Sequence, residues 1–266
     1  MTRALSLISV FVRVSVQNFA AYRFEFFVRM FVSVGHLLAE LLAVQTIFKN
    51  TPEIRGWQKE HMLVLVGVFR MIAGGIRMVI VPNMRRVMED IRNGTLDYVL
   101  LKPLDAQFHV SIREFVIWRV TDLVLGGSLA IYGSYLTLHT VPFDKFILFI
   151  LMMVAAFTIV YAIWLALAAI CFWLIRLENI EMLFWNVFEA GRFPVQIYPA
   201  WLQTGLTYIF PLAFIVTFPA ASLLGISGKG ITPTMPAIAF LVGLIAIILA
   251  SMLFRIGLRR YAGASA

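Results

Sequence analysis

The chain has 266 residues, of which 61% are hydrophobic and 14% are charged, and its formal net charge is +8. A soluble domain is about half apolar and about a quarter charged, so much of this chain is expected to face lipid. The composition leaves no soluble module with a basic, aromatic-interleaved patch, which argues against nucleic acid as a partner. The one cysteine, Cys171, excludes an intrachain disulfide, and no Cys/His cluster indicates a metal site. We expect a single transmembrane domain over residues 1–266.

The N-terminal stretch 1–22 carries apolar side chains at helical spacing, at Leu5, Ile8, Val12, Val16 and Phe19. Basic and polar side chains occupy the rest of the helical wheel. This pattern predicts an amphipathic helix that lies in the membrane interface. The alternative is that these residues form the frayed start of the first span.

Six stretches are long and apolar enough to cross a bilayer as helices, which takes about 20 residues. They lie near residues 24–48, 62–81, 112–136, 146–175, from 180 onward, and 236–258. The predicted fold class is therefore an all-α integral membrane protein with six transmembrane helices.

The segment 193–230 stays apolar but is interrupted by Pro194, Pro199, Pro211 and Pro219. Proline removes a backbone donor and kinks or ends a helix. Irregular backbone at membrane depth is tolerated where protein or a cavity surrounds it. We expect two short re-entrant helices that dip from the outer face between spans five and six. The alternative is a seventh, proline-kinked span, which would place the C-terminus outside.

Basic residues of the loops and ends are unevenly distributed. Most of them lie near the N-terminus, around the loop at 83–105 and near the C-terminus. The positive-inside rule then places both termini and this loop in the cytoplasm of a multi-pass protein of the plasma (inner) membrane. This orientation favours an even number of spans.

The loop at 83–105 is charged but has an ordered apolar pattern. Met84, Val87, Met88 and Ile91 fall at i, i+3, i+4 and i+7, which predicts a short amphipathic helix. Asn93-Gly94 is expected to end it, because both residues tolerate the left-handed conformation of a helix C-terminus.

A second helical turn is expected to follow this break. Thr95 is its expected cap, and Asp97 is favourable near its N-terminal end. Leu96, Val99 and Leu100 give the turn an apolar side, and Pro103 stops it. Whether this cytoplasmic element meets a partner, or packs on its own spans or on the lipid surface, stays open on these residues alone.

At these residues the chain resembles the ABC type-2 exporter permeases, in the branch of six-span permeases that work with a separate ATPase. The proline-rich segment 193–220 resembles the same family's region after the fifth span. The matching loop residues are Glu89, Gly94, Thr95, Leu96, Asp97, Leu100, Leu101 and Pro103.

The resemblance implies that 83–105 is a coupling helix seated in a groove of a separate ATP-binding subunit. Leu100 and Leu101 would bury apolar surface there, and Arg85, Arg86 and Arg92 would pair with acidic groove walls. ATP and Mg²⁺ would be held by the ATPase, and a second permease, identical or different, would complete the path. The phosphate-binding loop Gly-x4-Gly-Lys-Ser/Thr is not matched around Lys229, where Gly230 follows.

Charged residues inside the spans are costly and usually face the bundle interior. Glu40 and Arg70 each lie about eight residues below the outer ends of spans one and two, roughly 12 Å deep, and are expected to pair. Arg77 has two candidate partners, Glu25 and Asp122.

Glu189 and Arg192 are expected to pair at i, i+3. These charges either line the substrate path or hold the bundle together. Small residues such as Gly74-Gly75 and Gly126-Gly127 indicate close helix contacts.

Two other function classes compete with an ATP-driven permease. An ion-coupled secondary transporter would show paired broken helices in both halves, whereas the helix-breaking prolines here cluster in the second half. An intramembrane enzyme is suggested by Gly225-Ile226-Ser227-Gly228, which matches the Gly-x-Ser-Gly of rhomboid proteases. All four histidines precede that serine, whereas rhomboids place the histidine on a later span. The apolar spans suit lipids, hydrophobic drugs and lipid-linked glycans equally.

Overall fold

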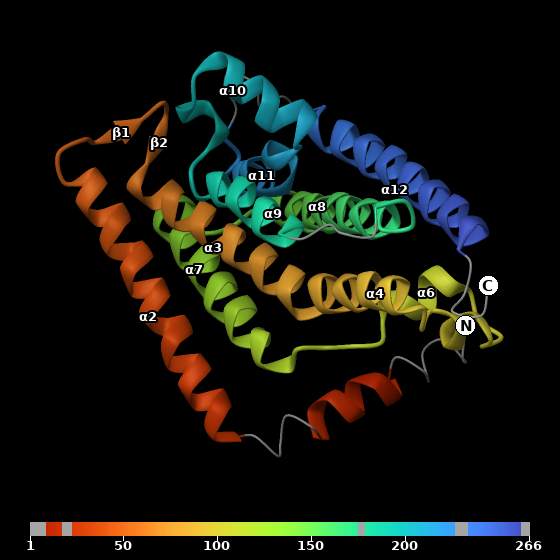
Figure 1. The fold of residues 1–266 in the computed structure, drawn as a ribbon. Helices are drawn as coiled ribbons and strands as arrows, with labels where there is room; N and C mark the ends of the chain where they lie inside the picture. The colour runs from red at the N-terminus through yellow and green to blue at the C-terminus, as the bar shows by residue number, and fades with distance from the viewer. Residues whose placement is uncertain (1–8, 18–22, 175–178, 227–233, 262–266) are drawn as a thin grey trace.

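The computed structural model describes residues 9–17, 23–174, 179–226 and 234–261, and nearly all of them are helical. Figure 1 shows one long helix, α2, beside a bundle formed by the other spans. Of the interfacial helix expected over 1–22, residues 9–17 are described and are helical. Its other parts, and the end of the proline-rich segment after residue 226, lie outside the described residues.

A tight hairpin joins the first two long helices. Helix α2 (Arg23–Phe48) is followed by strands β1 (Glu53–Ile54) and β2 (Trp57–Gln58), which pair antiparallel before α3 (Lys59–Gly75) begins. The two turn residues, Arg55 and Gly56, both have positive φ, at 54° and 86°. A two-residue turn of this kind matches the twist of paired strands. The hairpin thereby holds the end of α2 and the beginning of α3 side by side (Figure 1).

The second span continues past its expected end. Helix α3, the π-helical segment η1 (Ile76–Ile80) and α4 (Val81–Asn93) form a single helix of 35 residues. At about 1.5 Å per residue it is about 52 Å long, whereas the hydrocarbon core is about 30 Å thick. The expectation of a separate amphipathic helix after residue 83 is therefore corrected: that helix is the extension of the span.

The π-helical segment coincides with a proline. Pro82 has no N–H to donate to the carbonyl of Met78, and that carbonyl accepts a hydrogen bond of 2.9 Å from the backbone N–H of Val116 instead. Asn83 is fully buried and reinforces this link. Its side-chain amide donates to the Glu114 carbonyl at 2.8 Å, and its Oδ1 accepts from the backbone N–H groups of Arg113 and Glu114 at 2.8 and 3.0 Å.

The third span consequently begins later than expected. Helices α5 (Asp97–Leu100) and α6 (Ala106–Ser111) are followed by the non-helical stretch 112–116, a 3-10 turn η2 (Ile117–Arg119) and α7 (Val120–Leu138). The predicted start at Ile112 is wrong, because the backbone N–H groups of residues 113, 114 and 116 donate to Asn83 and Met78 on the neighbouring helix rather than to a helical turn of their own.

The rest of the chain contributes two long helices and a broken region. Helix α8 (Phe143–Ile170) packs on α12 (Met235–Arg260), as Figure 1 shows. Between them come α9 (Ile180–Phe188), the 3-10 turns η3 (Glu189–Arg192) and η4 (Val195–Ile197), and α10 (Ala200–Thr204). The π-helical segments η5 (Gly205–Ile209) and η6 (Ala213–Thr217) and helix α11 (Phe218–Leu224) complete the region.

The prolines of this region stand at helix beginnings and at the bend. Pro194 and Pro199 immediately precede η4 and α10, and Pro219 lies in the first turn of α11. Pro211 lies in the break between Ala200–Ile209 and Ala213–Leu224, which are bent by 77°. This geometry fits either a re-entrant pair or one broken span, so both readings of 193–230 remain.

Among the described residues, four helices are long and apolar enough to cross a membrane: α2, the helix from Lys59 to Asn93, α8 and α12. The bent pair counts as a fifth if it is one span. Helix α9, which was expected to be the fifth span, has nine residues and then tightens into η3. The chain is thus a multi-helix membrane protein, and the count of six spans stays a prediction.

Candidate functional site

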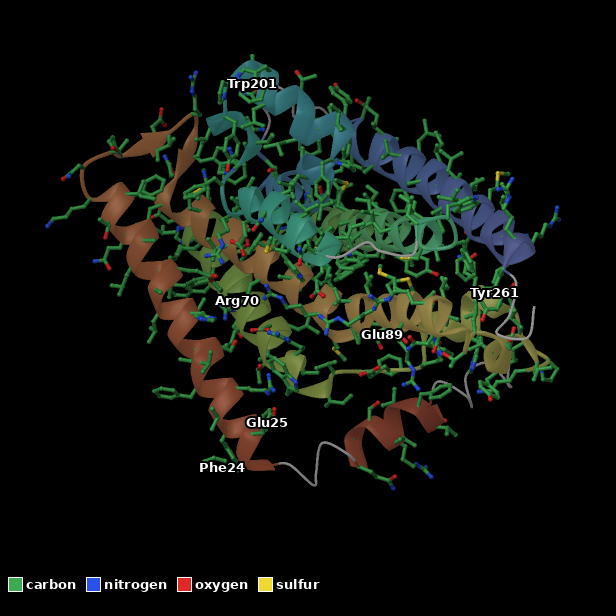
Figure 2. All side chains as sticks on the ribbon, in the orientation of Figure 1. Phe24, Glu25, Arg70, Glu89, Trp201 and Tyr261 are labelled. Atoms are coloured by element: carbon green, nitrogen blue, oxygen red, sulfur yellow. The ribbon has the colours of Figure 1, made fainter. Side chains whose placement is uncertain are left out.

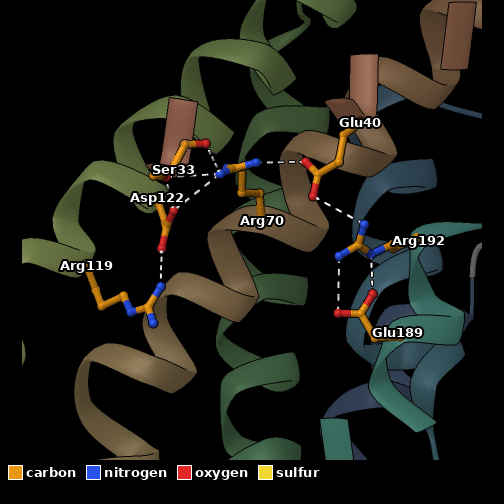
Figure 3. Close-up of polar contacts among 7 residues, drawn as sticks. All are labelled: Ser33, Glu40, Arg70, Arg119, Asp122, Glu189 and Arg192. Atoms are coloured by element: carbon orange, nitrogen blue, oxygen red, sulfur yellow. Dashed lines mark hydrogen bonds and ion pairs between the residues drawn. The ribbon is translucent and has the colours of Figure 1, made fainter. Parts of the chain in front are cut away.

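A buried arginine on α3 organises the polar centre of the molecule. Arg70 is 6% exposed, and its Nη1 donates to Glu40 Oε2 on α2 at 2.8 Å. Its Nη2 donates to the Ser33 carbonyl at 2.6 Å and lies 3.5 Å from Asp122 Oδ1 on α7 (Figure 3). The Glu40–Arg70 pair expected from their equal depth is present in the structure. Arg70 therefore ties three helices, α2, α3 and α7, together.

The network extends in both directions from Arg70. Asp122 is buried and accepts from Arg119 Nη1 at 3.0 Å and from the Ser33 hydroxyl. Glu40 lies 3.6 Å from Arg192, which also pairs with Glu189. Figure 3 shows these seven side chains as one chain of contacts between α2, α3, α7 and the η3 turn. The expected Glu189–Arg192 pair is thus present, but on a 3-10 turn rather than within a straight span.

The partners expected for Arg77 are wrong. Asp122 is engaged by Arg70 and Arg119, and Glu25 pairs with Arg29 one turn along α2. The Arg77 guanidinium instead lies over the ring of Trp185 on α9, 4.0 Å from its centroid. Periodicity could not reveal this contact, because residues 77 and 185 are brought together only by tertiary packing.

The sequence interpretation also missed two members of the network, Ser33 and Arg119. For Arg119 a signal existed, since it lies three residues before Asp122 and this spacing brings side chains together on a helix. For Ser33 none existed: a serine inside an apolar span usually bonds to its own helix backbone.

These side chains line a cavity of about 870 Å³ between α2, α3, α7 and α9. Its wall is strongly polar for a membrane protein, and aromatic residues stand beside the charges. The ionisable residues lining it are Glu25, Arg29, His36, Glu40, Arg70, Arg77, Arg119, Asp122, Glu181, Glu189 and Arg192. Arg70 and Asp122 are the buried members of this set, and buried ionisable groups inside membrane helices commonly mark a substrate or ion path.

A second hollow of about 640 Å³ continues toward the end of α4. It shares four lining residues with the first cavity: Arg77, Trp118, Arg119 and Glu181. Its far end is lined by Arg85, Arg86 and Glu89. Figure 2 labels Arg70 on α3, which lines the first cavity, and Glu89 on α4, which lines the second hollow. The two hollows together follow α3 and α4 from the polar centre to the charged end.

The element at 94–105 begins where the long helix ends. Gly94 has φ 70° and closes α4, as the Asn93-Gly94 pair predicted. Thr95 does not cap the next turn: its hydroxyl donates back to Asp90 Oδ1 at 3.0 Å, and Leu96 holds the cap position of α5. Pro103 lies after the end of α5, at an exposed position.

Helix α5 has one buried and one exposed apolar side. Leu96 and Val99 are buried against the molecule, whereas Tyr98 is 73%, Leu100 41% and Leu101 82% exposed. Asp97 lies in its first turn. Of the two leucines expected to contact a partner, Leu101 is the more available.

The arginines of α4 are partly engaged within the chain. Arg85 pairs with Glu181, and Arg86 lies 3.9 Å from Glu114. The expectation that both are free to meet acidic residues of a partner is corrected, since each already faces a carboxylate. Arg92 and Glu89 are exposed on α4.

No group of three or more His, Cys, Asp or Glu side chains in the described part of the chain could hold a metal ion. The serine of the Gly-x-Ser-Gly sequence considered for an intramembrane enzyme is residue 227, which lies outside the described residues. The sequence model of a family described as ABC-2 family transporter protein matches residues 34–265. A search of the curated proteins found no match.

Proposed function

Because the chain belongs to the ABC-2 transporter family, whose members are transport permeases of the membrane, we propose that it is the permease subunit of an ATP-driven exporter. ATP and Mg²⁺ are bound and used by a separate ATPase subunit in the cytoplasm. A second permease, a copy of this chain or a different one, completes the path. The protein lies in the plasma (inner) membrane with both termini in the cytoplasm.

The observation that carries the proposed docking site is the exposed face of α5. Tyr98 and Leu101 project from a short helix beyond the long helix, and both are more than two-thirds exposed. A few large apolar or aromatic anchors supply most of the energy of a small protein interface. The face lies at the same end of the molecule as the last turn of α12, which carries Arg259 and Arg260 (Figure 1). Basic residues at this end support its cytoplasmic placement.

Helix α6 connects the docking site to the spans. Gln107 Nε2 donates to Ser251 Oγ on α12 at 3.0 Å, and the Ser111 and Tyr161 hydroxyls lie 2.7 Å apart between α6 and α8. Displacement of α5 by a nucleotide-driven ATPase would therefore be passed to α8 and α12 as well as to the long helix. The polar cavity beside α3 is the proposed half of the translocation path.

The proposal is tested by purifying the chain with its ATPase and measuring ATP hydrolysis and transport in proteoliposomes. Leu101→Asp places a charge in the apolar contact and is expected to reduce co-purification of the ATPase and ATP-driven transport at least tenfold. The matched control is Trp201→Asp, an exposed aromatic on α10 at the other end of the molecule. Equal binding and transport by the Leu101→Asp variant would refute the docking site. Transport by the permease alone on an ion gradient would favour the secondary-transporter alternative.

A further inference from the structure

Five arginines and five carboxylates line the first cavity, but they are not paired one to one within it. Three carboxylates of the polar centre, Glu40, Asp122 and Glu189, are in ion pairs with three arginines, Arg70, Arg119 and Arg192. Two further carboxylates pair at the rim, Glu25 with Arg29, and Glu181 with Arg85 of the adjoining hollow. Every carboxylate that lines this cavity is therefore occupied by an arginine. Among the described residues, the lining arginine left without an ion pair is Arg77.

The position of Arg77 is unusual in the backbone as well. It lies in η1, the π-helical interruption of the long helix. Such interruptions inside α-helices are frequent at functional sites, where they redirect a side chain. Arg77 is half-buried and lines both hollows, so its guanidinium stands where the two meet.

Aromatic rings hold the arginines of this junction in place. The Arg77 guanidinium carbon lies 4.0 Å from the centroid of the Trp185 ring. The guanidinium carbons of Arg29 and Arg119 lie 4.6 and 3.8 Å from the centroid of the Trp118 ring. A guanidinium stacked on a ring is positioned by one face, and its N–H edge stays available to an anion. The preorganised edge suits bidentate binding of a phosphate or carboxylate group.

We propose that Arg77 is the anion-binding residue of the cavity, and that the ligand is an amphiphile with a single anionic headgroup, of the phosphate monoester kind. The headgroup pairs with Arg77, the one lining arginine that has no carboxylate partner among the described residues, because Glu181 is paired with Arg85 outside this cavity. Its apolar part lies against Val28, Val32 and Phe69, which line the same cavity. This inference rests on the proposed transport function for calling the ligand a substrate, whereas binding itself does not require the ATPase.

The test uses the purified full chain in phosphatidylcholine nanodiscs, with tryptophan fluorescence as the readout because Trp185 touches Arg77. The probe is hexadecyl phosphate. The comparison arms are hexadecanol, hexadecyltrimethylammonium and inorganic phosphate, which separate headgroup charge, chain and free anion. We expect saturable binding of hexadecyl phosphate and at least tenfold weaker binding in the three other arms.

Variants assign the binding to the residue. Arg77→Gln is expected to weaken hexadecyl phosphate binding about 10- to 100-fold, because a charge-assisted hydrogen-bonded contact is lost. Arg77→Lys keeps the positive charge but loses the planar guanidinium, so its affinity for hexadecyl phosphate is expected to lie between those of the unaltered chain and Arg77→Gln. The matched control is Arg55→Gln in the exposed hairpin, which should bind as the unaltered chain does. A thermal melt of each variant verifies that it is folded.

Two results would overturn the inference: equal binding of hexadecyl phosphate by folded Arg77→Gln, or equal binding of the cationic and anionic amphiphiles by the unaltered chain. Tight binding of inorganic phosphate alone would overturn the amphiphile part. Failure of the ATPase to associate would refute the proposed function and leave this binding result standing. Conversely, ATP-driven transport without any binding of hexadecyl phosphate would refute only the inference about the ligand.

Discussion

Gly67 on α3 and Gly35 on α2 provide a matched pair of helix-interior glycines with opposite surroundings. A Cβ added at Gly67 would lie 2.6 Å from both the Ala130 backbone nitrogen and the Gly126 carbonyl oxygen of α7. A Cβ added at Gly35 would meet nothing within 4 Å. We therefore expect Gly67→Ala to lower the free energy of unfolding and Gly35→Ala to leave it unchanged or raise it.

The magnitude follows from two opposing effects. Replacing a helical glycine by alanine stabilises the helix by up to about 1 kcal/mol, and this gain applies at both positions. At Gly67 the new methyl meets backbone atoms, which cannot rotate away, so α3 and α7 must separate. Overpacking of this kind costs about 1–3 kcal/mol or more. Because the contact involves two backbone atoms, we expect the upper end of that range, a net loss of about 2 kcal/mol, and a difference of about 3 kcal/mol between the two variants.

The measurement is reversible unfolding in mixed micelles at rising dodecyl sulfate fraction, followed by helical circular dichroism. Both variants are compared with the unaltered chain under the same conditions. The difference between them isolates the steric effect, since the gain in helix propensity is common to both. Equal stability of Gly67→Ala and Gly35→Ala would refute the close approach of α3 and α7.

Three further predictions concern the polar centre and the segment 94–111. Arg70→Met is expected to lower the free energy of unfolding by about 1–3 kcal/mol in the same assay, less than the 3–5 kcal/mol typical of a broken buried pair. The reason is that Glu40 and Asp122 each keep a second arginine partner. A decrease of more than about 5 kcal/mol would contradict this sharing. Gly94→Val forces a β-branched residue to φ 70°, and Leu100→Asp places a charge at the half-exposed position beside Leu101. Both variants are expected to lower ATP-driven transport while membrane insertion persists. Unchanged transport by both variants would count against coupling through this element. Burial and the nearby Lys102 and Arg113 lower the pKa of His109 below its ordinary value near 6.5, so the folded chain keeps this imidazole neutral and loses stability as the pH falls through that value. Between pH 7.5 and about 5.5, the thermal stability of the unaltered chain should therefore fall more than that of His109→Gln. Equal pH slopes for the two proteins would show that His109 is not responsible.

Local rules were sufficient where a feature depends on neighbouring residues. The left-handed Gly94 and the Glu189–Arg192 spacing were both readable from the sequence. The Glu40–Arg70 pair was also predictable, because both charges stand at the same depth from a short hairpin that fixes the two helices side by side.

Features that depend on distant residues were not predictable in this way. The apolar pattern from Met84 onward looks like a separate surface helix, and nothing local shows that Arg85 and Arg86 meet Glu181 and Glu114 instead of a partner protein. The late start of α7 depends on Asn83, a polar residue whose buried bonds to residues 113 and 114 replace a helical turn. A periodicity argument treats each segment alone and therefore extends helices through such points.

The unbroken helix from Lys59 to Asn93 has a mechanical consequence. Measured from Met78 in η1, it has arms of about 28 Å toward the β1–β2 hairpin and about 22 Å toward α5. A rotation of about 10° around that point would move the end at α5 by about 4 Å and the end at the hairpin by about 5 Å in the opposite direction. The hairpin joins that end to α2, and α2 forms one wall of the charged cavity. Such a rotation would couple a movement of α5 to a movement of the cavity wall formed by α2, and Arg77 lies next to the point of rotation.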